Sequence, residues 1–253
     1  MEPALAELAE HTEVHLLPRY GFEIVDHGGL AYVAGQRDAN LHPYRVDDPP
    51  AAVAWAREEG RRRAHRTIEW WVGWRAQPSD LGDRLIEQGL KRSDDPPTLV
   101  GMTCATATPT EPFIEVRRVE TLDDYLAVME VDWTAWNVPA AEREERRERE
   151  RARFEPMLEC GTVHHFAGLL QGAPVGIGRA IDMDGGVALF GGAVVPEARG
   201  KGVYRALVRA RWDHAVARGT PLLVVQAGPM SGPVLEGLGF RRHGEIQLYC
   251  DRL

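Results

Sequence analysis

The stretch Val194-Val-Pro-Glu-Ala-Arg-Gly-Lys-Gly-Val-Tyr-Arg205 joins the end of an apolar run to the start of a helical pattern. Gly200 and Gly202 permit backbone angles that other residues resist, and as glycines they bare the N–H groups beside the helix N-terminus, where the helix dipole favours an anion. Positive charge is added at the same place by Arg199, Lys201 and Arg205. The stretch therefore predicts a turn that binds the pyrophosphate of an anionic cofactor.

The residues on both sides of this turn predict a mixed sheet. Before it, three antiparallel strands are expected at residues 164–170, 174–181 and 187–195, separated by turn sequences. After it, a helix over residues 203–218 ends at Gly219 and leads into residues 221–226, which are apolar on both faces as a buried strand requires. The order of strand, turn, helix and strand supports the phosphate turn more than the glycine pair alone does.

Composition limits the function classes. The chain has 253 residues and a formal net charge of −8, so nucleic acid is not an expected partner. Its 3 cysteines form no disulfide framework or zinc motif, and neither a secretory signal nor a membrane-spanning stretch is recognised. We expect a cytoplasmic protein with no membrane partner and no metal, because the histidine groupings lack acidic partners in a recognised pattern.

The chain is predicted to hold two related domains. The threonine- and proline-rich stretch Thr106-Ala-Thr-Pro-Thr-Glu-Pro112 resists regular structure and marks the boundary. On its two sides, Leu85-Ile-Glu-Gln-Gly-Leu-Lys-Arg92 lines up with Leu235-Glu-Gly-Leu-Gly-Phe-Arg-Arg242, each between two expected strands. The alternative is a chance match of a short window. The expected division is a domain at residues 1–105, a linker at 106–113 and a second domain at 114–253.

The phosphate turn closely resembles motif A of the GNAT superfamily of acyl-CoA N-acyltransferases, because Arg199, Gly200, Lys201 and Gly202 match its pattern. Tyr204 stands where the family usually has a small residue. The resemblance continues through Ser231-Gly-Pro-Val-Leu-Glu-Gly-Leu-Gly-Phe240, which is similar to the family's next motif. It implies an α/β fold with a mixed sheet, made of two GNAT-like domains in tandem. The N-terminal copy is degenerate, since Val46-Asp-Asp-Pro-Pro50 before its helix has no glycine-rich turn.

The resemblance implies acetyl-CoA as co-substrate and direct attack by an amine, without an acyl-enzyme. The residues implied to bind the cofactor are Ala193, Val194, Val195, Arg199, Gly200, Lys201, Gly202, Val203, Tyr204, Arg205 and Ser231. Many relatives protonate the leaving thiolate with a tyrosine, but Leu235 stands at that position here. Tyr204 or water is the remaining candidate acid, and Glu197 is the nearest acidic residue to the position where relatives place a base.

The acceptor is expected to be the amine of a small molecule or peptide. Candidates to contact it are Trp133 and Trp136, which are alternatively core aromatics, and Gln226, which alternatively caps splayed strands. Ser231 is alternatively a helix N-cap. Two other functions stay open: a module that binds acyl-CoA without turnover, and an inert scaffold. Neither the acceptor's identity nor an oligomeric state follows from the sequence.

Overall fold

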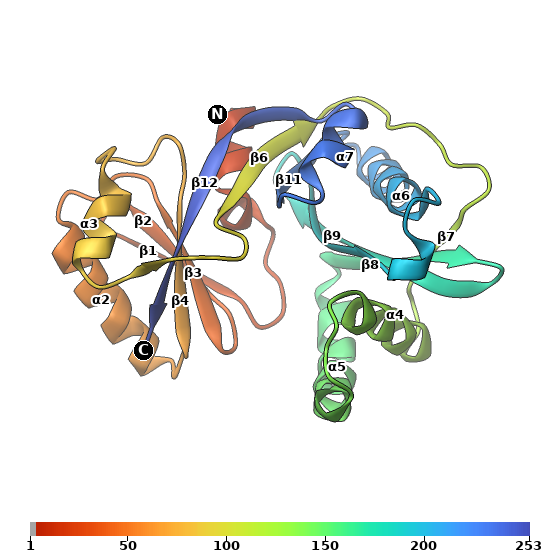
Figure 1. Ribbon diagram of the computed structural model, residues 1–253, viewed down its shortest axis with the longest axis horizontal. Helices are drawn as coiled ribbons and strands as arrows, with labels where there is room; N and C mark the ends of the chain where they lie inside the picture. The colour runs from red at the N-terminus through yellow and green to blue at the C-terminus, as the bar shows by residue number, and fades with distance from the viewer. Residues whose placement is uncertain (1–3) are drawn as a thin grey trace. The chain divides into compact units, whose positions relative to one another are not determined.

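The computed structural model describes residues 4–253, and Figure 1 traces its helices and strands. The helices are α1 (Leu5–Glu10), α2 (Pro49–Arg62), α3 (Leu81–Glu87), α4 (Leu122–Ala135), α5 (Ala140–Cys160), α6 (Val203–Ala217) and α7 (Gly232–Gly237), with 3-10 turns η1 (Thr12–His15) and η2 (Pro196–Ala198). The strands are β1 (Glu23–His27), β2 (Leu30–Ala34), β3 (Asp38–Pro43), β4 (Thr67–Val72), β5 (Lys91–Arg92), β6 (Thr98–Cys104), β7 (Glu115–Arg118), β8 (Val163–Leu170), β9 (Ala173–Met183), β10 (Gly186–Val194), β11 (Leu223–Ala227) and β12 (Arg241–Arg252). Parallel and antiparallel pairing among these strands confirms the predicted α/β fold class with a mixed sheet.

The chain packs into two compact units. The first unit contains Gly21–Thr103, Val225–Leu253 and the described residues before Leu16. Its strands follow the order β1-β2-β3-β4-β12-β6, and only β3 and β4 pair in parallel. Strand β4 alternates between buried and half-buried residues, which places Ile68 and Trp70 in the core at 0% exposure.

The second unit contains Leu16–Tyr20 and Cys104–Val224. Strands β8 to β10 form the predicted antiparallel meander, β7 pairs antiparallel with β8, and Leu223 and Val224 of β11 pair in parallel with β10. Helix α6 lies against one face of β8, β9 and β10, and α4 lies against the other face (Figure 1). The expected strands and the expected helix after the turn are confirmed, apart from small shifts at their ends.

Glycines on three strand positions allow α6 to pack closely on the meander. A Cβ at Gly168 would lie 2.7 Å from Val203 Cγ1, and one at Gly176 would lie 2.6 Å from the same atom. A Cβ at Gly178 would lie 3.1 Å from the guanidinium carbon of Arg211. Because protein interiors are close-packed, side chains at these positions would push α6 away from the sheet. The glycines therefore fix the position at which α6, and the turn before it, meets β10.

The packing units differ from the predicted division at residues 106–113. Residues Val225–Leu253, expected in the second domain, pack in the first unit, where β12 pairs with β4 on one side and with β6 on the other. The buried Ile246 and Leu248 of β12 need neighbouring strands, and the sequence pattern of a strand does not say which sheet supplies them. Packing units and related domains are different divisions of a chain, so the expected domains stay a prediction.

Candidate functional site

The predicted phosphate turn lies between η2 and α6. Gly200 has φ 74° and Gly202 has φ 87°, so both glycines adopt the left-handed conformation that the sequence predicts. Helix α6 starts directly after Gly202 and continues for 15 residues, which gives its N-terminus an aligned dipole. A Cβ at Gly200 would meet no atom within 4 Å. The turn is therefore open to an anion on the side of Gly200.

Two of the three basic side chains of the turn contact other residues of the chain. Arg199 Nε donates to the carbonyl oxygen of Val194 at 3.2 Å, so this guanidinium supports the end of β10. Arg205 Nε lies 2.5 Å from Glu111 Oε1. Lys201 is exposed and has no ion-pair partner among residues 4–253. Of the predicted cations, Lys201 is therefore the one whose charge is fully available to a ligand.

Strand β10 is interrupted where the acyl group is expected. Its register with β9 shifts between Phe190 and Ala193, and Gly191 has φ 48°. In the described part of the chain, β10 has register partners on β11 only at Val187 and Ala188. The strand continues to Val194 without further pairing on that side, as expected for a strand that leaves room for a cofactor arm.

The implied donors on β10 need one correction. Ala193, Val194 and Val195 are all buried, but Val195 N–H donates to the carbonyl oxygen of Val175 at 3.0 Å. This N–H is already used in the sheet and is not available to a thioester carbonyl. Because successive peptide groups of a strand alternate in direction, the neighbouring Val194 N–H faces away from β9. The sequence motif names the segment but does not give this alternation.

Two arginines flank the interruption, one from each face of the sheet. On the α4 side, a Cβ at Gly191 would lie 3.3 Å from Arg179 Nη1. On the α6 side, a Cβ at Gly192 would lie 2.9 Å from Tyr204 Cε2 and 3.7 Å from Arg211 Nη2. Any side chain at either glycine would separate these cations from the backbone of β10. The segment that resembles the thioester site is therefore bare of side chains and surrounded by positive charge.

Arg211 is the residue of this region that sequence reasoning missed. Its side chain is 1% exposed; Nε donates to the Leu207 carbonyl at 2.9 Å and Nη1 to the Arg179 carbonyl at 3.4 Å. Burial lowers the pKa of Arg211, and a hydrogen bond with Tyr204 acts in the opposite direction. No carboxylate pairs with this guanidinium within the described chain. A buried cation without a counter-charge is costly, which makes it a candidate for function.

Asp132 on α4 is a second missed residue. It is half-buried and its Oδ1 accepts a hydrogen bond from Trp136 Nε1 at 3.1 Å. Burial raises the pKa of this carboxyl, although the charge of Arg179 and the bond from Trp136 act in the opposite direction. Asp132 is therefore a carboxyl group of raised pKa that interacts electrostatically with Arg179, the arginine beside Gly191. No sequence motif marks it, because the environment comes from β9 and α4 together.

The remaining candidates of the second unit differ in exposure. Tyr204 is half-buried against Gly192, as described above, and Glu197 is exposed on η2 beside the phosphate turn. Trp133 is 3% exposed and belongs to the core, whereas Trp136 is 58% exposed. Of the tryptophan pair, only Trp136 presents a surface that an acceptor can contact.

Three further candidates belong to the first unit. Gln226 Nε2 donates to the carbonyl oxygen of Glu10 at 2.8 Å, and Gln226 Oε1 is buried without a partner. Ser231 lies at the N-cap position of α7, but its hydroxyl donates to the Gly228 carbonyl at 3.3 Å and does not cap the helix. Leu235 is 0% exposed, so the position of the missing tyrosine is an apolar core position here.

The first unit has no glycine turn before α2, as the sequence predicts. Instead, Asp48 is the N-cap of α2, and its Oδ1 accepts a hydrogen bond from Ala51 N–H at 3.1 Å. In the first unit a carboxylate thus occupies the N-terminus of α2, whereas in the second unit the N-terminus of α6 presents bare N–H groups. This arrangement leaves no place for a phosphate at α2.

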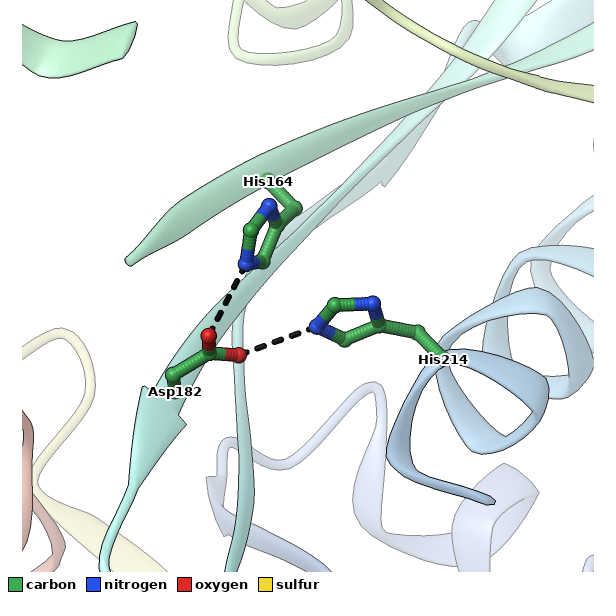
Figure 2. A group of neighbouring side chains, drawn as sticks. All are labelled: His164, Asp182 and His214. Atoms are coloured by element: carbon green, nitrogen blue, oxygen red, sulfur yellow. Dashed lines mark hydrogen bonds and ion pairs between the residues drawn. The ribbon is translucent and has the colours of Figure 1, made fainter. Parts of the chain in front are cut away.

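His164, Asp182 and His214 form a buried group from three elements, β8, β9 and α6 (Figure 2). Asp182 Oδ2 lies 3.1 Å from His164 Nε2, and Asp182 Oδ1 lies 2.9 Å from His214 Nε2. Burial raises the pKa of Asp182, but the hydrogen bonds from both histidines outweigh it and hold that pKa far below its usual range. No sequence pattern connects Asp182 with these histidines, because the three residues are distant in sequence.

The group can offer a metal ion three ligand atoms, but its arginine neighbours oppose this. Arg118 Nη2 lies 2.6 Å from His164 Nδ1, and a guanidinium only donates hydrogen bonds. The proton of a neutral His164 ring is therefore on Nε2, the atom that a metal would need. Arg218 Nη1 also lies 3.2 Å from Asp182 Oδ1. We interpret the group as structural: its hydrogen bonds hold α6 against β8 and β9.

Other surfaces of the molecule add no further candidate residue to the site. A cavity of about 240 Å³ in the first unit is lined by residues of β6, α7 and β12, and one of about 110 Å³ in the second unit lies beside His164 and His165. Neither is lined by a residue implied to bind the cofactor. Within residues 4–253, the helices are all too short or too polar to span a membrane.

Comparisons with known proteins agree with this geometry. Residues 125–229 match the model of the acetyltransferase (GNAT) family, which covers α4 to β11 and thus the phosphate turn. No curated protein matches the chain in sequence.

Solved structures show the same fold over nearly the whole chain. A GCN5-related N-acetyltransferase from Kribbella flavida is 15% identical, with a TM-score of 0.70 over 99% of this chain and 96% of its own. A tandem GNAT protein from the clavulanic acid biosynthesis pathway is 18% identical, with a TM-score of 0.61 over 99% of this chain and 88% of its own. A GCN5-related N-acetyltransferase from Sphaerobacter thermophilus is 16% identical, with a TM-score of 0.59 over 90% of this chain and 82% of its own.

Proposed function

Because residues 125–229 carry a domain of the acetyltransferase (GNAT) family in a chain with the fold of a tandem GNAT protein, we propose that this protein is an N-acetyltransferase. It transfers an acetyl or other short acyl group from acetyl-CoA to a primary amine of a small molecule or peptide. The observation that carries the proposal is the turn with Gly200 and Gly202 at φ 74° and 87°, directly before α6. Its bare N–H groups and Lys201 would hold the pyrophosphate.

The interruption of β10 would hold the thioester. Val194 N–H faces away from β9, and Arg179 and Arg211 lie beside Gly191 and Gly192. Positive charge fixed beside the carbonyl stabilises the oxyanion that develops when an amine adds to the carbonyl carbon, and such stabilisation is often a large part of catalysis. This role also explains why a guanidinium is buried without a carboxylate partner at Arg211.

Two side chains are placed to move protons. On the α4 side, Asp132 would accept a proton from the ammonium group of the acceptor, which frees the nitrogen lone pair for attack, and its raised pKa brings the carboxyl closer to the range of an effective base. On the α6 side, the Tyr204 phenol would give its proton to the thiolate of coenzyme A as the carbon–sulfur bond breaks. Glu197 lies next to the phosphate turn, which makes it a weaker candidate for the base than Asp132.

Further parts of the proposal concern the surroundings of the site. Trp136, exposed and bonded to Asp132, would contact the acceptor. The first unit would not bind acyl-CoA at α2, because Asp48 occupies that helix N-terminus. A cytoplasmic location fits the free thiols of Cys104, Cys160 and Cys250.

The first experiment follows thermal unfolding with increasing acetyl-CoA. A ligand present at 100 times its dissociation constant stabilises a protein by about 2.7 kcal/mol, which shifts the melting temperature by several degrees. We expect a saturable rise for the native chain and none for Gly202→Glu, which places a carboxylate against the turn. Gly172→Glu is the matched control, because Gly172 also has a positive φ of 80° but lies in the turn between β8 and β9.

Turnover distinguishes the enzyme from a module that only binds acyl-CoA. The release of free thiol from acetyl-CoA is measured with a panel of amines, amino acids and lysine peptides. Amine-dependent release supports the transferase. Saturable binding with no release from any of the panel favours the binding module, and the absence of binding contradicts both.

A further inference from the structure

Glu111 lies against the phosphate turn. Its Oε1 is 2.5 Å from Arg205 Nε on the first turn of α6. Its Oε2 lies 2.9 Å from the position that a Cβ on Gly202 would have. The side chain of Glu111 is 22% exposed and that of Arg205 is 50% exposed. A carboxylate of the chain thus stands beside the glycine at which the turn should receive the cofactor.

The segment that carries Glu111 is held on α6 at a second point. Thr108 is 1% exposed, and its carbonyl oxygen accepts a hydrogen bond from Arg209 Nη1 at 2.8 Å. Arg205 and Arg209 are one helical turn apart and therefore lie on the same side of α6. The segment from Thr108 to Glu111 follows this side of the helix back to the turn, so the position of Glu111 does not depend on one exposed ion pair.

We propose that Glu111 is a built-in competitor of the cofactor's phosphates: its carboxylate neutralises Arg205 in the ligand-free protein and leaves the turn when acetyl-CoA binds. This inference rests on the proposed function of the turn. It assigns to residue 111 a role in setting the affinity for the cofactor.

The charges of the turn explain why the carboxylate must leave. With Arg199 bonded to the end of β10 and Arg205 paired with Glu111, the turn offers a dianionic pyrophosphate only Lys201 and backbone N–H groups. A carboxylate left within a few ångströms of the phosphates would repel them. Once Glu111 moves away, Arg205 becomes available as a second cation, so the cofactor gains a partner and loses a repulsion in one step.

The test measures the dissociation constant of acetyl-CoA by calorimetry for the native protein, Glu111→Gln and Glu115→Gln. Gln keeps the size of residue 111 and one oxygen that can accept a hydrogen bond from Arg205, but it removes the charge. Glu115 is the matched control: it is paired with Arg117 at 2.6 Å on β7, and its substitution changes the net charge by the same amount. We expect Glu111→Gln to bind about fivefold more tightly, which is about 1 kcal/mol at 1.4 kcal/mol per tenfold change. Glu115→Gln should bind as the native protein does.

The outcomes separate the inference from the proposed function. If the native protein binds acetyl-CoA as tightly as Glu111→Gln does, or more tightly, the proposed role of Glu111 is overturned and the transferase proposal stands. Equal gains in Glu111→Gln and Glu115→Gln also overturn it, because they show an effect of net charge alone. The absence of binding in all three proteins overturns the phosphate turn itself, and with it both proposals.

Discussion

Replacing Arg211 with methionine should leave the folded state about as stable as before and should strongly reduce acetyl transfer. The side chain is 1% exposed, so the substitution removes a buried cation and fills most of its volume with an apolar chain. Most core substitutions behave differently, because they reduce stability first. The contrast tests whether this guanidinium is present for the fold or for the reaction.

The expected size of the effect follows from the contacts of Arg211. Two hydrogen bonds to carbonyls are lost, those of Nε to Leu207 and Nη1 to Arg179, and hydrogen bonds of charged groups contribute about 1.5–3 kcal/mol each. Against this, the cost of burying a cation is several kcal/mol, and replacing buried ionic groups with apolar ones is often neutral or stabilising by about 1–4 kcal/mol. These contributions have opposite signs and similar size, so the free energy of unfolding should change by less than the ~2–5 kcal/mol that truncation of a core side chain costs. Loss of one donor to an oxyanion should lower kcat by about 10²–10³.

Urea unfolding of Arg211→Met and the native protein measures the first quantity, and thiol release from acetyl-CoA measures the second. Leu207→Ala is the control for sensitivity: Leu207 is one turn earlier on the same face of α6 and 0% exposed, and its truncation should cost about 2–5 kcal/mol. If Arg211→Met loses as much free energy of unfolding as Leu207→Ala does, the reasoning is refuted. Arg211 would then be a residue that stabilises the fold, with its charge balanced by its surroundings.

Three further substitutions test other parts of the site. Asp132→Asn should lower kcat/KM by about 10²–10⁴ and remove the acidic limb of the pH profile of kcat/KM. The control Asp123→Asn, on the exposed start of α4, should change neither. An unchanged acidic limb in Asp132→Asn excludes Asp132 as the base. Burial, followed by the charge of Arg179, holds the pKa of His165 well below its usual value. The unfolded chain therefore binds a proton at this residue below about pH 6.5 while the native state does not, so stability should fall as the pH drops below that value. His165→Gln should reduce that slope by about 1.4 kcal/mol per pH unit in urea unfolding, and equal slopes would contradict it. Gly168→Ala should destabilise by about 1–3 kcal/mol in the same assay, because its Cβ would lie 2.7 Å from Val203 Cγ1; no loss would mean that α6 moves freely on the sheet.

The fold was largely predictable because its signals are local. The meander shows short apolar runs separated by glycine turns, and the phosphate turn needs positive φ at Gly200 and Gly202, which the structure has. Thr121 is the N-cap of α4, and its hydroxyl oxygen accepts a hydrogen bond from Asp124 N–H at 3.2 Å, three positions later. Each of these features involves residues close in sequence, so periodicity and turn chemistry are sufficient to find them.

The site was less predictable because its decisive contacts join distant elements. Arg211 looks like one more basic residue of an amphipathic helix until the glycines of β9 and β10 bring the sheet against it. Asp132 acquires its raised pKa from burial, which no local pattern gives. A prediction limited to motifs therefore finds the turn that we propose as the phosphate site and misses the side chains around the proposed acyl site.

The two units illustrate how the position of a carboxylate in the chain decides what it does at a helix N-terminus. Asp48 is the N-cap of α2 and accepts a hydrogen bond from the N–H of Ala51, only three positions later, so an incoming phosphate cannot displace it without unwinding the helix start. Glu111 reaches α6 from a separate segment, through a half-exposed ion pair worth at most about 1 kcal/mol, and a dianion that binds the same turn outcompetes it. A cap next in sequence closes a phosphate site permanently, whereas a carboxylate supplied from a distance only sets the affinity. On this argument, removing the capping carboxylate is not enough to give the first unit a phosphate site. Asp48→Gly should uncap α2 and lower stability by a few tenths of a kcal/mol. It should create no affinity for acetyl-CoA, since the residues before α2 lack the paired glycines of the second unit.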